Sequence, residues 1–156
     1  MGLYEETEKI LRKYGIRANK SLGQNFLISD TVVENIIESA DTAVNSKSQS
    51  VNLRYGHDSI LMPLSCLLEL DNFGLEINDL EDVAALGWHD YKVVPMGGNI
   101  QIVFYRPAAD QISTPENVLV KVLLNEVECV LPLQPVEGPY YKWSDLREYY
   151  LKKLGS

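Results

Sequence analysis

Three β-forming runs in the second half of the sequence predict that the chain builds a sheet. They are rich in branched and aromatic residues, which pack well on a pleated surface. The runs are Ile100–Tyr105, Val118–Leu124 and Val127–Leu133. Only Asn125 and Glu126 separate the last two runs, and such a short polar connection predicts a hairpin.

Apolar residues at helical spacing predict helices on both sides of these runs. The expected helices are residues 3–14, residues 31–40, Ser59–Leu70, and a last helix from about Ser144 to Leu154. In the last helix, Leu146, Tyr150 and Leu154 fall on one face. Thr31 and Glu34 have capping-box spacing at the start of the second helix. The predicted fold class is therefore α/β, a mixed sheet with flanking helices and two helices at the N-terminal end.

The residue composition changes after the second expected helix. Residues 42–50 are small and polar, which predicts a linker or a surface turn. We therefore divide the chain into a helical segment, residues 1–41, and a larger segment, residues 42–156. Val51–Tyr55 opens the larger segment as an expected buried strand. Because an apolar sheet edge needs cover, we expect the N-terminal helices to pack against the sheet and form one unit with it.

The composition is that of a globular protein, with 156 residues of which 46% are hydrophobic and 23% charged. No apolar run approaches the ~20 residues of a membrane span. Acidic residues stand where a signal peptide has basic ones. We therefore expect a cytoplasmic protein with no membrane contact. Cys66 and Cys129 both lie in apolar runs, which predicts two buried free thiols.

The charge of the chain is unevenly distributed. The formal net charge of −8 argues against a general nucleic-acid binder, because neutralising phosphates requires clustered cations. Residues 9–20 nevertheless hold a basic patch without any acidic residue, made of Lys9, Arg12, Lys13, Arg17 and Lys20. A solvated helix face is the ordinary interpretation of such a patch, and contact with RNA is the alternative.

One motif near the N-terminus is long and specific. It reads Lys20-Ser21-Leu22-Gly23-Gln24-Asn25-Phe26-Leu27-Ile28, preceded by Leu11-Arg12-Lys13-Tyr14-Gly15. Over roughly residues 3–40 the chain resembles the start of the ribosomal RNA adenine dimethyltransferases. The resemblance implies that Asn25 and Leu27 are vestigial contacts to S-adenosylmethionine. The Gly-rich cofactor turn and the catalytic aromatic motif of that family are absent from the sequence, so we expect no methyl transfer.

A second set of motifs covers the larger segment. The motifs are Leu53-Arg54-Tyr55-Gly56-His57-Asp58, Asn99–Arg106, Val118–Asn125 and Tyr140–Trp143. In this order they resemble the C-terminal part of the histidine acid phosphatases, the family of phytases and multiple inositol polyphosphate phosphatases. The resemblance implies a partial histidine-phosphatase-like sheet. It also implies that His57 binds phosphate and that Asp58 is the general acid that protonates the leaving group.

The nucleophile of that family is missing from this sequence. The family requires an R-H-G-x-R-x-P segment, whereas the only histidines here are His57 and His89, and neither lies in one. The main hypothesis is therefore a fused, truncated phosphatase-like chain that is inactive alone and whose ligand is a phosphate ester. A second chain that supplies the nucleophile is one alternative. A ribosomal RNA methyltransferase-like or RNA-contacting module that uses residues 9–20 is the other.

No cofactor, metal or RNA partner is expected under the main hypothesis. An exposed sheet edge suggests self-association.

Overall fold

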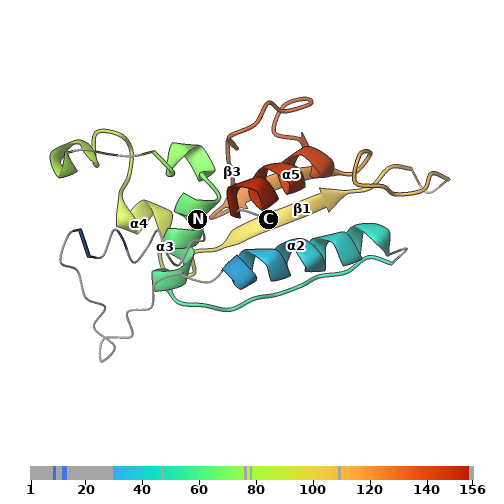
Figure 1. The fold of residues 1–156 in the computed structure, drawn as a ribbon, viewed down its shortest axis with the longest axis horizontal. Coiled ribbons are helices and arrows are strands. Elements are labelled where there is room, and N and C mark those ends of the chain that lie inside the picture. Colours follow the sequence, from blue (N-terminus) through green and yellow to red (C-terminus); the bar gives the residue numbers. More distant parts are fainter. Residues whose placement is uncertain are drawn as a thin grey trace.

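A computed structural model describes residues 9, 12, 13, 30–46, 48–75, 77, 79–108 and 110–154. This part of the chain combines helices with a four-stranded antiparallel sheet (Figure 1). The helices are α2 (Asp30–Asn45), α3 (Asp58–Leu67), α4 (Asp90–Val93) and α5 (Trp143–Leu154), with short 3₁₀ turns η2 (Leu70–Asn72) and η3 (Leu80–Asp82). The strands are β1 (Ile100–Tyr105), β2 (Leu119–Leu124), β3 (Val127–Glu128) and β4 (Tyr141–Lys142).

Strand β2 is the centre of the sheet and pairs with β1, β3 and β4. All of these pairings are antiparallel, so the expectation of a mixed sheet is wrong. The predicted hairpin is confirmed: β2 and β3 meet at Asn125 and Glu126, whose φ angles are 51° and 64°. Two positive φ angles give the turn a twist that matches the twist of the flanking strands. β3 is shorter than predicted, and Pro132 downstream has no N–H to donate to a ladder.

The core lies between one face of the sheet and the helices α2 and α5. Side chains alternate along β2, and Val120, Val122 and Leu124 are buried on the covered face. Phe104 of β1 stacks edge-on against Trp143 of α5, with ring centroids 5.1 Å apart. The predicted apolar face of α5 is confirmed, since Leu146, Tyr150 and Leu154 are all buried.

Helix α2 extends beyond the expected boundary and packs into this same core. It ends at Asn45, so the predicted linker begins four residues too early, at 42. The extension adds Val44 to a buried stripe that also contains Val33, Ile37 and Ala40. These side chains share one hydrophobic cluster with the β2 residues. The division into residues 1–41 and 42–156 stays a prediction.

An ion pair and a hydrogen bond join α2 to α5. Asp41 of α2 accepts a hydrogen bond from Trp143 Nε1 at 2.9 Å. Its second oxygen accepts from Arg147 Nε at 2.8 Å. One carboxylate therefore anchors two side chains that lie more than a hundred positions further along the chain.

The predicted strand at Val51–Tyr55 is wrong. This segment runs along α2 (Figure 1) and makes no strand pairing in the described part of the chain. Arg54 holds it there, since its Nη2 donates to Asn35 O at 3.1 Å and to Ser39 Oγ at 2.8 Å. These bonds to α2 favour a position beside the helix over one in the sheet.

The two cysteines are free thiols, as predicted. Cys129 is buried and Cys66 is half-buried. Burial raises the pKa of both thiols, for Cys129 to about 12. In the part of the chain that the structure describes, no helix is long and apolar enough to cross a membrane.

Glu69 connects the end of α3 to α5. Its carboxylate accepts a hydrogen bond from Tyr149 Oη and pairs with Lys153 Nζ at 2.8 Å. Partial burial raises the pKa of Glu69, but the bonds from Lys153 and Tyr149 outweigh burial and lower it below its ordinary value. The hydrogen bond to Glu69, together with burial, raises the pKa of Tyr149 to about 12.

We expect Glu69→Gln to lower the free energy of unfolding at neutral pH by about 1 kcal/mol, because it removes a charge-assisted pair with limited exposure. A carboxyl with a lowered folded pKa contributes stability above its unfolded pKa and loses it as pH falls through the folded value. The gap between wild type and Glu69→Gln should therefore close as the pH falls below the ordinary pKa of glutamate. Urea titrations across that range measure it, with the exposed Glu148→Gln as control. A gap that is independent of pH would contradict this account.

Candidate functional site

His57 and Asp58, the predicted phosphate ligand and general acid, lie at the start of α3. His57 occupies the N-cap position with φ −90° and ψ 167°, and its side chain makes no capping hydrogen bond. Asp58 is the first residue of the helix. Its Oδ1 accepts a hydrogen bond from the backbone of Ser59 at 2.7 Å. Both side chains are exposed.

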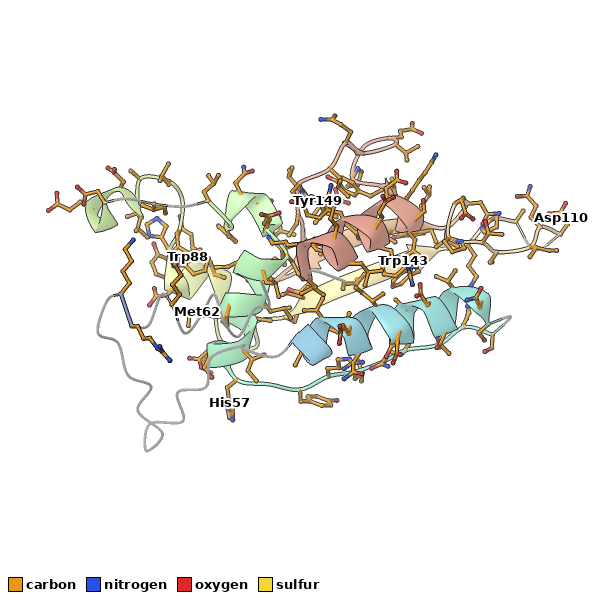
Figure 2. The ribbon with its side chains drawn as sticks, viewed as in Figure 1. His57, Met62, Trp88, Asp110, Trp143 and Tyr149 are labelled. Atoms are coloured by element: carbon orange, nitrogen blue, oxygen red, sulfur yellow. The ribbon has the colours of Figure 1, made fainter. Side chains whose placement is uncertain are left out.

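The surroundings of this pair do not form a catalytic site in the described part of the chain. Figure 2 shows His57 directed away from the sheet and the helices. The nearest arginine in sequence, Arg54, is bonded to α2. Two surface hollows, one along α2 and one between α2 and α5, are lined by other residues. Phosphoryl transfer needs several cations converging on one enclosed pocket, and the exposed pair lacks that arrangement.

The described residues contain no group of three or more histidine, cysteine, aspartate or glutamate side chains that could hold a metal ion. The hydrogen bond to Glu69 and burial raise the pKa of Tyr149, and burial raises the pKa of Tyr150. Tyr150 lies in the core and Tyr149 packs against it.

The basic patch is described at three of its five positions. Lys9, Arg12 and Lys13 are helical and exposed. Because residues three and four apart are neighbours on a helix, these cations share one face. The other two members, Arg17 and Lys20, lie outside the described residues. So do the predicted cofactor contacts, Asn25 and Leu27.

Comparison with known proteins concerns the N-terminal region. No protein-family model matches the chain. The chain is 55% identical over 40 residues to a probable ribosomal RNA small subunit methyltransferase A of Methanothermobacter thermautotrophicus. The matched residues are 26% of this chain and 15% of that protein. Ribosomal RNA small subunit methyltransferase A of Latilactobacillus sakei is 49% identical over 37 residues, 24% of this chain and 12% of that protein. The Clostridium botulinum protein of the same name is 54% identical over 35 residues, 22% of this chain and 13% of that protein.

These likenesses support the first of the two predicted resemblances and overturn the main hypothesis. The short N-terminal region is similar to ribosomal RNA methyltransferases, as expected from its motif. The phosphatase hypothesis is wrong, because the relatives carry the methyltransferase name and nothing supports a phosphatase. The sheet likewise gives no support to a histidine-phosphatase-like fold. The matched segment spans only 12–15% of the length of these relatives.

Two residues hold distant segments of the described chain together in ways that no sequence pattern indicates. Arg54 ties an exposed segment to α2, a role that its sequence motif does not predict. Asp41 was placed at the edge of a linker, whereas it joins α2 to α5. No local signal identifies either role, because each depends on a partner brought close only by folding.

Proposed function

We propose that this chain is an RNA-contacting protein, related at its N-terminal end to ribosomal RNA methyltransferases, and that the basic patch of residues 9–20 makes the contact. The observation that carries the proposal is the 55% identity over 40 residues to a protein named as a ribosomal RNA methyltransferase. The proposal replaces the expectation that RNA is not a partner.

Physical chemistry supports the choice of this patch. The chain as a whole has a net charge of −8, which repels a polyanion, so any contact needs a local concentration of cations. Lys9, Arg12 and Lys13 provide one on a single exposed helix face. The proposal does not extend to methyl transfer, since the matched segment is a small part of each relative. Asn25 and Leu27 stay predicted contacts to S-adenosylmethionine.

We expect the full chain to bind a fragment of small-subunit ribosomal RNA with an affinity that falls as salt rises. The triple variant Arg12→Glu, Lys13→Glu, Arg17→Glu should reduce the slope of log K against log salt by about 3 and weaken binding at low salt at least tenfold, because each cation lost removes about one phosphate contact. Fluorescence anisotropy over a salt series measures both quantities.

A matched control separates local contact from overall charge. Replacing Lys92, Lys142 and Lys152 by glutamate changes the net charge by the same amount at exposed positions elsewhere. This control variant should keep most of the salt dependence. Equal losses in the two variants would reduce the interaction to overall charge and refute a defined contact. The absence of salt-dependent binding by the wild type would refute the proposal as a whole.

A further inference from the structure

The outer edge of β1 carries backbone groups without partners in the described part of the chain. The amide of Asn125 donates to Asn99 O at 2.9 Å, so residues 99, 101, 103 and 105 face β2 in this antiparallel ladder. Ile100, Ile102 and Phe104 therefore direct their N–H and C=O groups to the opposite side. None of these backbone groups makes a hydrogen bond there with another described residue.

The segment 49–56 is a second strand-like element with unpaired backbone groups. It is extended alongside α2 (Figure 1), and no backbone hydrogen bond is formed by residues 49–56 within the described part of the chain. Val51, Leu53 and Tyr55 alternate along it and are 83%, 69% and 91% exposed. Side chains two apart stand on the same side of an extended chain, so these three form one apolar row.

We propose that two copies of this chain form a dimer in which one of these elements from each copy pairs with the other element of its partner. The segment 49–56 of each copy adds as an antiparallel strand to the outer edge of β1 in the other copy. Two such contacts related by a two-fold axis form an isologous dimer, in which each element of one copy meets the other element of its partner. This proposal is independent of RNA binding.

Charge and side-chain pattern favour a second copy as the occupant. β1 reads Ile-Gln-Ile-Val-Phe-Tyr and has neither the charged residues nor the proline with which natural edge strands prevent pairing. The charge of Arg54 is already turned toward α2. These same bonds hold the segment against the helix of its own copy, which leaves the β1 edge open to the segment of another.

The pairing also covers apolar surface. α2 and α5 cover one face of the sheet, whereas Val103, Leu119 and Leu123 stand on the opposite face and are only half-buried. A strand added beside β1 with its apolar row on that face would place the exposed row against this surface. Lateral contact between this row and Val103 adds to the hydrogen bonds that the pairing forms.

Light scattering coupled to size-exclusion chromatography tests the proposal on the full chain. We expect a wild-type dimer and a monomer for both Asn52→Pro, which removes an amide that faces β1 in this pairing, and Leu53→Lys, which puts a charge in the apolar row. Circular dichroism should show both variants folded, because the side chains of Asn52 and Leu53 are exposed. Leu86→Lys, at a residue 57% exposed in a different loop, is the matched control and should remain dimeric.

Hydrogen exchange locates the interface. The amides of Ile102 and Phe104 should exchange slowly in the wild-type dimer and at least tenfold faster in Asn52→Pro. A wild-type chain that stays monomeric at all concentrations would overturn the proposal. A dimer that survives both substitutions would also overturn it, and protected Ile102 and Phe104 amides in that dimer would assign pairing to two β1 edges instead.

Discussion

Trp143→Ala should lower the free energy of unfolding by about 3–5 kcal/mol, the range for removing a large buried aromatic side chain. The ring of Trp143 is 3% exposed and packs edge-on against Phe104. Its indole N–H also donates to Asp41 of α2. The substitution therefore opens a cavity in the core and breaks the contact between α2 and α5. Denaturant titration followed by circular dichroism measures the loss.

Two variants separate the contributions of the cavity and the hydrogen bond. Trp143→Phe keeps a ring beside Phe104 but leaves one oxygen of Asp41 without its donor, so it should cost about 1–2 kcal/mol. As a control, Tyr91→Ala should cost much less, since the side chain of Tyr91 is 65% exposed. A loss below about 1 kcal/mol for Trp143→Ala would contradict the assignment of this residue to the core.

Asn125→Ala should lower the free energy of unfolding by about 3 kcal/mol through two separate effects. Asn125 has a φ of 51°, a left-handed conformation that alanine adopts at a cost of about 1–2 kcal/mol. Its side chain also connects three segments. The Oδ1 accepts from Asn99 N at 3.0 Å, and the Nδ2 donates to Lys92 O and Val93 O at 3.0 and 3.1 Å.

Asn125→Gly distinguishes the two effects because glycine tolerates the left-handed conformation. It should lose the side-chain hydrogen bonds alone and be less destabilised than Asn125→Ala. Asn125→Asp keeps the acceptor for Asn99 but sets a carboxylate oxygen against the carbonyls of Lys92 and Val93, so it should also be less stable than the wild type. Thermal unfolding of the three variants gives the order. Equal stability of the glycine and alanine variants would show that backbone conformation contributes nothing at this turn.

The elements that local patterns predicted are those governed by short-range chemistry. β1 has the predicted bounds, Ile100–Tyr105, because its branched and aromatic residues suit a strand whatever its neighbours. The turn at Asn125 and Glu126 follows from a two-residue connection between strands. The face of α5 follows from helical spacing.

The functional predictions differ in the same way, between a local motif and residues that depend on distant partners. The N-terminal resemblance rests on one contiguous motif, and the comparisons support it. The phosphatase hypothesis rested on several short strand-like motifs in order, whose residue types are common to many sheets, and it is wrong. His57 and Asp58 need cationic partners from elsewhere in the chain, and none of the described contacts provides them.

The sequence by itself determined β1, the turn at Asn125 and Glu126, the buried face of α5, where the cations gather, and which proteins the N-terminal region is similar to. Tertiary structure alone decided that the sheet is antiparallel, that residues 51–55 stay outside it, and that His57 and Asp58 are exposed. The reason is the range of the deciding contacts. Arg54 and Asn35 are 19 positions apart, and Asp41 and Trp143 are 102 apart. Such pairs leave no trace in local periodicity, because they form only when the chain is folded.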